Sequence, residues 1–348
     1  MREGDETMST CDEGGIDPRI ARQRAYAVLG ALLVEGLDAE GLARVRALPG
    51  LGDALAAASA SEPASGAAEL DALAAEHQEL FGHEVFPFAG VFMGPSGLVG
   101  EGAAAGVVRV ARRALGLPSP QGPSPDHLGQ GLRVLEVLAD AERQARAHRD
   151  ADDVRTLEGW QRRVLDEALL PWMPPLWAAI AGQPVSVWTR AVELAVGVLA
   201  RHRSELGGLS LTTGPGLHAT GDVETVLDEP KAGLAAVARA LVTPARSGVY
   251  LARRDLAALA RRSELPQGFG GRADVLERLL RVAAEYGQLP RVMIELRRLL
   301  EARDDAYAGL AAEPGLAPYV PAWRRRLASS LRLVERLRSA VPRATEID

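Results

Sequence analysis

Apolar residues recur at every third or fourth position along most of this chain, and that spacing places them on one face of an α-helix. In the first part of the chain it predicts four helices, which run from Asp17-Pro18 to Gly36, from Asp38 to Leu48, from Pro49-Gly50 to Ala60, and from Glu62 to Phe81. Gly82 is expected to end the fourth helix. No run alternates apolar and polar residues as a half-buried strand does. The pattern therefore predicts an all-α protein.

A second series of helical patterns follows, and a linker divides it. Helices are predicted before the linker over residues 103–115, 128–149, 152–169 and 184–206, and after it over residues 232–242 and 253–262, around 275–283, from 290 onward and over 321–340. Residues 207–222 are rich in Gly and Thr and predict the linker. Residues 1–15 are polar and predict a disordered tail. The expected units are a helical domain over residues 16–206 and a C-terminal helical extension over residues 223–340.

The stretch from Leu80 to Leu135 departs from this regular pattern. Residues 85–98 are apolar, but Pro and Gly interrupt them too often for one helix, and they hold three of the chain's five phenylalanines. Ser124-Pro125-Asp126-His127-Leu128 is typical of a helix start, with Ser124 as the N-cap and Pro125 in the first turn. Asp126 then adds a dipole interaction, and an exposed His127 adds less. Substitution of Asp126 or His127 is therefore expected to leave the melting temperature nearly unchanged.

Composition and charge exclude several classes of protein. The chain has 348 residues, is 47% apolar and carries a net charge of −6, which argues against nucleic acid as a main partner. Cys11 is the only cysteine, so disulfides, iron–sulfur clusters and thiolate zinc sites are not expected. The acidic first residues do not resemble a signal peptide, and no apolar run is long enough to span a membrane. A soluble, cytoplasmic protein without membrane insertion is the expectation.

Few residues suggest catalysis or a bound cofactor. The glycines between Met93 and Gly102 are not followed by the lysine that a phosphate-binding loop needs, since Lys231 is the only lysine. His77, His83 and Glu84 have no regularly spaced third ligand, so a buried histidine is favoured over a metal site. No serine has a nucleophile-elbow context. Neither a cofactor nor a metal is expected, and the protein is not expected to be an enzyme.

Four short segments together resemble a known family. They are Leu80-Phe81, Pro87-Phe88-Ala89-Gly90-Val91-Phe92, Pro125-Asp126-His127-Leu128 and Leu169-Leu170-Pro171-Trp172. This order is similar to that in the TorD/DmsD/NarJ family of redox-enzyme maturation chaperones. The chain departs from the family at Ala89, where an acidic residue is usual, at Ala168 in place of a histidine, and in lacking a glutamate before Pro125. The resemblance covers roughly residues 16–206, and residues 227–248 look similar to a segment of longer family members.

The resemblance implies a fold, a function and a site. The fold is a TorD-like helical bundle with an additional C-terminal helical domain. The implied function is to bind the apo-form of a molybdenum-cofactor oxidoreductase catalytic subunit, or its twin-arginine leader peptide, until the cofactor is inserted. The leader would offer an apolar segment to a groove and two guanidinium groups to carboxylates. The candidate client-binding residues are Phe88, Phe92, Met93, Glu84, Glu101, Asp126, His127, Leu128 and Trp172.

Two alternatives stay open from the sequence. A helical small-molecule-binding protein or enzyme could use Asp126 and His127 on its ligand. A chaperone could also bind a subunit that carries no twin-arginine signal. For some of the phenylalanines and Met93, burial beneath a loop is the favoured explanation of their apolar character.

Overall fold

The computed structural model describes residues 17–61, 66–118, 122–208, 223–228 and 233–340. Within these residues the regular elements are helices, and the only strand-like pairing is an isolated antiparallel bridge between Phe88 and His127. The prediction of an all-α fold is confirmed. No helix in the described ranges is both long enough and apolar enough to cross a membrane.

The helices follow the sequence pattern closely. The first part contains α1 (Pro18–Glu35), α2 (Ala39–Arg46), α3 (Leu51–Ser61), α4 (Ala67–Gln78), α5 (Ala89–Met93), α6 (Ala104–Ala114), α7 (Leu128–Ala147), α8 (Ala151–Arg163), α9 (Met173–Ala181) and α10 (Val187–Glu205). The extension contains α11 (Leu234–Val242), α12 (Pro244–Ser247), α13 (Arg253–Arg262), α14 (Arg272–Glu285), α15 (Leu289–Leu310) and α16 (Val320–Ala340). Two π-helices, η1 (Glu79–Glu84) and η2 (Val164–Leu169), and two 3₁₀ turns, η3 (Leu170–Trp172) and η4 (Val223–Asp228), complete the described elements.

Local sequence explains where several helices begin. The Asp17 carboxylate accepts a hydrogen bond from the Arg19 amide at 2.8 Å, and Pro18 occupies the first helical position of α1. Ser186 and Thr189 form a capping box at the start of α10, in which each side chain accepts from the backbone amide of the other. Such caps satisfy amides that have no partner inside the helix.

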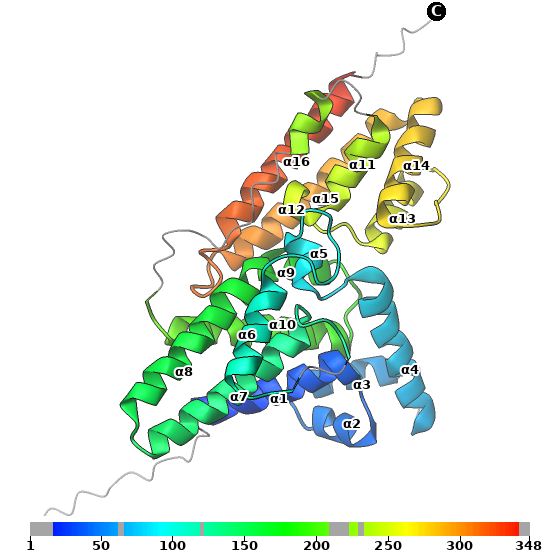
Figure 1. Ribbon diagram of the computed structural model, residues 1–348. Coiled ribbons are helices and arrows are strands. Elements are labelled where there is room, and N and C mark those ends of the chain that lie inside the picture. Colours follow the sequence, from blue (N-terminus) through cyan, green and yellow to red (C-terminus); the bar gives the residue numbers. More distant parts are fainter. Residues whose placement is uncertain (1–16, 62–65, 119–121, 209–222, 229–232, 341–348) are drawn as a thin grey trace, which may run out of the picture.

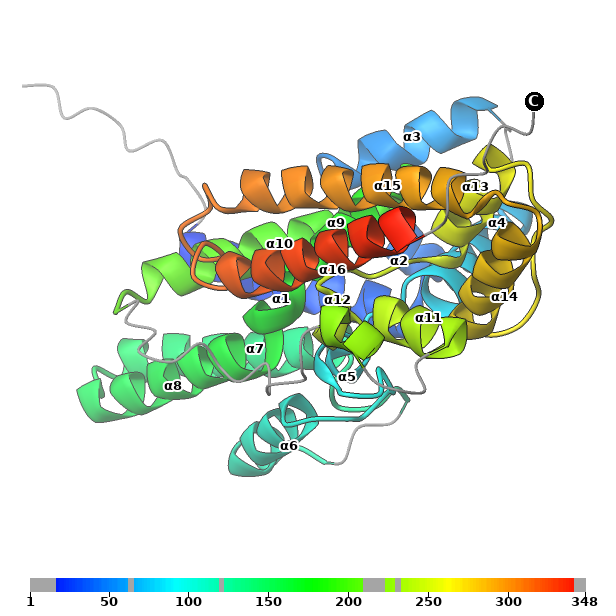
Figure 2. The same ribbon diagram turned by 90° about the horizontal axis from the view of Figure 1, so that it is seen from above.

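Three long helices form the centre of the first part. α1 packs against both α7 and α10, and α8 runs along α7 (Figure 1). α6 packs against η2 and lies at the outer edge of the bundle when seen from above (Figure 2). The Trp188 indole is fully buried and donates to the Leu73 carbonyl at 3.1 Å, which ties α10 to α4. The framework is thus held by buried apolar faces with a few internal hydrogen bonds.

The extension packs directly onto the first part. α15 and α16 lie side by side, and α9 contacts both α10 and α15 (Figure 2). The Trp323 indole donates to the Pro171 carbonyl at 2.7 Å, and both parts contribute to one continuous hydrophobic core. The division into two domains at residues 207–222 stays a prediction. The proposed tail over residues 1–15 and residues 209–222 of the linker lie outside the described residues.

Gly82 does not end the fourth predicted helix. The chain passes without interruption from α4 into η1, and it leaves the helix at Val85, whose amide donates to the Leu80 carbonyl at 2.7 Å. Gly82 is not among the glycines with a left-handed backbone, which a glycine C-cap requires. The predicted stop at Gly82 was therefore wrong. π-Helical turns of this kind are frequent at functional sites.

Candidate functional site

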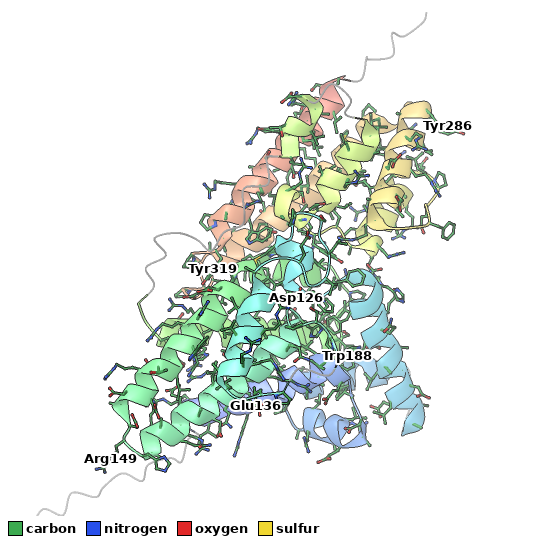
Figure 3. All side chains as sticks on the ribbon, viewed as in Figure 1. Asp126, Glu136, Arg149, Trp188, Tyr286 and Tyr319 are labelled. Atoms are coloured by element: carbon green, nitrogen blue, oxygen red, sulfur yellow. The ribbon has the colours of Figure 1, made fainter. Side chains whose placement is uncertain are left out.

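The four family-like segments meet where the chain following η1 crosses the start of α7. The Ala89 amide donates to the Asp126 carbonyl at 3.0 Å, and the Leu128 amide donates to the Pro87 carbonyl at 2.9 Å. These two bonds form the isolated bridge at Phe88 and His127. Figure 3 shows Asp126 near the middle of the molecule, beside α5. Segments far apart in the sequence are therefore joined by backbone pairing at this crossing.

Asp126 holds two loops together through one carboxylate oxygen. Its Oδ2 accepts hydrogen bonds from the amides of Gly90 and Gly100, each at 3.0 Å. The side chain is only 3% exposed, and Oδ1 has no hydrogen-bond partner among the described residues. A Cβ at Gly90 would lie 2.4 Å from the Leu98 carbonyl oxygen, so only glycine allows this close approach. Asp126 acts as an internal bridge between α5 and the loop after it.

His127, and not Ser124, caps α7. The His127 amide donates to the Ser124 carbonyl in a turn, and α7 begins at Leu128. The imidazole Nδ1 accepts from the Gly129 amide at 3.1 Å, so this nitrogen carries no proton. The predicted exposed position of His127 was also wrong, because the ring is 5% exposed and packs edge-on against Phe88 at 4.8 Å. The pairing with residues 87–89 moves the helix start to Leu128 and buries the histidine.

Burial keeps His127 uncharged. Desolvation lowers the pKa of His127 to about 4, and the neighbouring Asp126 carboxylate opposes this shift without cancelling it. The neutral imidazole is the form that accepts the Gly129 hydrogen bond. His127 is therefore an uncharged structural cap near pH 7 and not a cation that could repel an arginine-rich ligand.

The loop between α5 and α6 exposes two adjacent apolar side chains. Leu98 is 63% exposed and Val99 is 50% exposed. The Glu101 Oε2 accepts from the amides of Ser96 and Leu98, at 3.1 and 3.3 Å. Asp126 holds the Gly100 amide on the other side of the pair. Two carboxylates therefore fix the backbone of a loop that presents a leucine and a valine to water.

Phe92 lies on the opposite, covered side of the same segment. Its ring is fully buried, stacks on Trp172 at 5.4 Å between ring centroids, and contacts Tyr250 at 5.1 Å. The Trp172 indole donates to the Ala168 carbonyl at 2.8 Å. Tyr250 belongs to the extension, so the third ring of this cluster comes from a distant part of the chain.

Glu84 also joins the candidate site to the extension. Its Oε2 accepts from the Arg254 amide at the start of α13, at 2.9 Å, and its carbonyl accepts from the Tyr250 hydroxyl at 2.9 Å. The residue is 7% exposed, and burial raises the pKa of the Glu84 carboxyl. The tyrosine oxygen further accepts from the Phe86 amide at 3.4 Å. Glu84 is thus part of the contact between the two parts of the chain.

The candidate residues therefore divide into buried and accessible sets. Phe92, Leu128 and Trp172 are fully buried, and Glu84, Asp126 and His127 are nearly so. Phe88, Met93 and Glu101 are half-buried. In this conformation the first six can shape a site but cannot contact a client, and their role in client binding stays a prediction.

Sequence reasoning missed Leu98, Val99 and Tyr250. A leucine and a valine enclosed by Gly97 and Gly100 were a usable signal, since an apolar pair in a glycine loop has few ways to be buried. Tyr250 follows Gly248, whose backbone is left-handed and whose Cβ would lie 2.4 Å from the Leu327 amide. That glycine indicates close packing at this point, but the partner of Tyr250 could not be read from it.

Comparison with known proteins gives one match. Residues 40–178 match the family model described as nitrate reductase delta subunit. This range contains the four family-like segments, the exposed Leu98–Val99 pair and the crossing at Asp126. No curated protein and no solved structure matches the chain significantly. The resemblance to redox-enzyme chaperones is thereby confirmed over residues 40–178, which are similar to the nitrate reductase delta subunit family, a NarJ/TorD-type family of molybdoenzyme maturation chaperones.

Proposed function

We propose that this protein is a cytoplasmic, non-catalytic chaperone that binds the apo-form of a molybdoenzyme catalytic subunit and its twin-arginine leader peptide before export or assembly. The observation that carries the proposal is the exposed pair of Leu98 and Val99, held on a fixed loop inside the family-matched range. Exposed apolar side chains that the backbone keeps in place favour binding of an apolar segment.

The loop is suited to repeated binding because little of it must be ordered by the client. Its backbone is already held by Glu101 and Asp126, so the entropy cost of fixing Leu98 falls on folding and not on association. The half-buried Phe88 and Met93 add apolar surface in the same segment. An incompletely folded subunit exposes apolar segments that would otherwise aggregate, and such a surface can cover them.

The bonding of Asp126 and His127 supports the chaperone over a small-molecule enzyme. Asp126 Oδ2 and His127 Nδ1 both bind backbone amides, and both side chains are almost inaccessible to water. A general acid or base must reach its substrate within hydrogen-bond distance. A chaperone needs only that these residues hold the loop in position.

The test replaces the exposed pair and measures binding of a molybdoenzyme catalytic subunit in its apo-form. The variant L98D/V99D is expected to fold normally and to lose at least about tenfold in affinity, since each buried apolar side chain contributes roughly 1.5–3 kcal/mol. V185D is the matched control, because Val185 is 74% exposed and lies on the connection between α9 and α10. Equal affinity of both variants and the wild type would exclude this loop as the client contact.

A further inference from the structure

The carboxylates that family resemblance offers to the leader's arginines are already engaged. Glu84 binds the Arg254 amide, Glu101 binds two amides of its own loop, and Asp126 binds the amides of Gly90 and Gly100. Withdrawing any of them to bind a guanidinium would leave backbone donors without an acceptor. A leader peptide needs apolar surface beside a carboxylate that is free.

In four cavities of the described part of the chain, the carboxylates already have partners within the protein. These carboxylates pair with arginines or cap helices; they are Asp17, Glu35, Asp38, Glu40, Glu142, Glu158, Glu205, Asp255 and Glu295. A fifth cavity differs. It contains Asp153, for which the described residues show no ion-pair or side-chain hydrogen-bond partner.

This fifth cavity is a groove between the end of α6 and the α7–α8 hairpin, here called the α6–α8 groove. Its volume is about 420 Å³, within the range of ligand-binding clefts. Its apolar lining consists of Ala114, Leu115, Ala141, Ala145, Leu157 and Trp160. Leu115, Leu157 and Trp160 are half-buried, so their apolar surface is partly open to solvent. The groove is an open cleft of mixed lining on the surface of the family-matched segment, in which Gln144, His148 and Thr156 lie beside these apolar residues.

The acidic groups of the α6–α8 groove lie at its hairpin end, where His148 also lines the cavity. Asp150 caps α8 through hydrogen bonds from the amides of Asp152 and Asp153, at 3.1 and 3.0 Å. Asp153 lines the cavity one turn further along, while Asp152 faces away and pairs with Arg155. Arg149, at the tip of the hairpin in Figure 3, lies at the end of the molecule remote from Asp126. The groove is therefore separate from the crossing at Asp126.

We propose that the α6–α8 groove binds the leader peptide, with an arginine of the twin pair at Asp153 and the following apolar residues against Leu115, Leu157 and Trp160. The chemistry of the two surfaces is complementary, since the leader joins guanidinium groups to an apolar stretch. The inference rests on the proposed function and deepens it. It assigns the leader to this groove and the unfolded subunit to the Leu98–Val99 loop.

The experiment titrates the full chain with a fluorescein-labelled twin-arginine leader peptide of a molybdoenzyme catalytic subunit and with its Gln-Gln version. D153N is expected to weaken the Arg-Arg peptide by roughly threefold to fivefold, as for a solvent-accessible ion pair, and to leave the Gln-Gln peptide unchanged. A141W fills the groove and is expected to weaken both peptides by at least about tenfold. The matched controls are D152N, with the same charge change outside the groove, and A147W on the exposed side of α7.

The outcomes separate this inference from the proposed function. Leader binding that survives D153N and A141W overturns the assignment to the groove and leaves the chaperone proposal intact. Equal weakening by D152N and D153N shows a general charge effect and also overturns it. If the wild-type protein binds no leader but binds the apo-subunit through Leu98 and Val99, the leader site is lost and the chaperone role stands.

Discussion

Phe92 and Leu98 belong to one short segment, yet their surroundings are opposite. Phe92 is fully buried between Trp172 and Tyr250, whereas Leu98 is 63% exposed on the next loop. The extension covers the first side through Tyr250 and the start of α13. On the second side, carboxylates from Glu101 and Asp126 hold the loop, and the leucine side chain stays largely open to solvent. Apolar character alone does not distinguish the two positions.

The difference indicates that the family-like residues serve two purposes. Those on the covered side hold the two parts of the chain together, and those on the open side present a surface. Asp126 connects the covered side to the open side, because one of its carboxylate oxygens binds an amide of α5 and an amide of the exposed loop. A substitution on the covered side should therefore change stability first, and one on the open side should change binding first.

The largest expected effect is at Phe92. F92A removes a fully buried ring from the cluster and should lower the free energy of unfolding by about 3–5 kcal/mol. L98A, on the open side, should change it by less than about 0.5 kcal/mol. Urea denaturation of both variants measures the contrast. Similar losses for F92A and L98A would contradict the division into covered and open sides.

Asp126 should show the next largest effect. D126A leaves the buried Gly90 amide without an acceptor and frees the Gly100 amide to water, which should cost about 2 kcal/mol of folding free energy. This replaces the expectation, based on an exposed helix start, that the melting temperature would hardly change. D71A on the exposed face of α4 is the control and should be nearly neutral. A neutral D126A would mean that the two amides find other partners.

His127 should make stability depend on pH. Its pKa of about 4 in the folded state lies below the value of about 6.5 expected in the unfolded chain, so the unfolded chain binds the proton more tightly. The contribution of neutral His127 to the free energy of unfolding is therefore fully present above about pH 6.5 and is lost as the pH falls toward 4. Between pH 7 and pH 5 the wild type should lose about 2 kcal/mol more than H127Q.

The buried His202, whose pKa burial lowers to about 3, titrates in the same direction and is present in both proteins. Comparing H127Q with the wild type therefore isolates His127. Denaturant titrations at several pH values provide the measurement. Parallel pH profiles for the two proteins would show that the His127 ring is accessible to water in the folded state.

The smallest of these effects should come from Tyr250. Y250F keeps the ring against Phe92 but removes the hydroxyl that donates to the Glu84 carbonyl, so a loss of about 1 kcal/mol is expected. Y286F is the control, because Tyr286 is 71% exposed at the end of α14. A loss no larger than that of the control would show that the hydroxyl bond contributes little to the contact with the extension.

Local pattern was enough to predict the helices, because apolar spacing and capping residues act within a few positions. The start of α1 at Asp17-Pro18 and the extents of α6 and α13 agree closely with prediction. The missed features depend on distant partners. His127 caps α7 because residues 87–89 pair with it, and Glu84 is buried because Tyr250 and Arg254 reach it.

The sequence was enough to identify several residues of the site but not to predict how they are arranged. Motif resemblance singled out Asp126 and Phe92, yet it gave no way to tell a carboxylate that binds amides from one that faces solvent. That distinction depends on which glycines let one backbone segment pack closely against another. The close approach of Gly90 to the Leu98 carbonyl is visible only in the structure. Asp153 lies outside every motif and was not a candidate from the sequence.

The hydrogen bond from Trp323 to the Pro171 carbonyl has a consequence for synthesis of the chain. A ribosome makes the family-like segments long before residue 323, and domains generally begin to fold as they emerge. Until residues 250–254 have left the exit tunnel, Phe92 lacks its contact with Tyr250 and Glu84 lacks its partners in the extension, and Pro171 waits longer still for Trp323. A nascent chain of this protein would thus expose its own apolar cluster, and it would itself need protection before it could protect another protein.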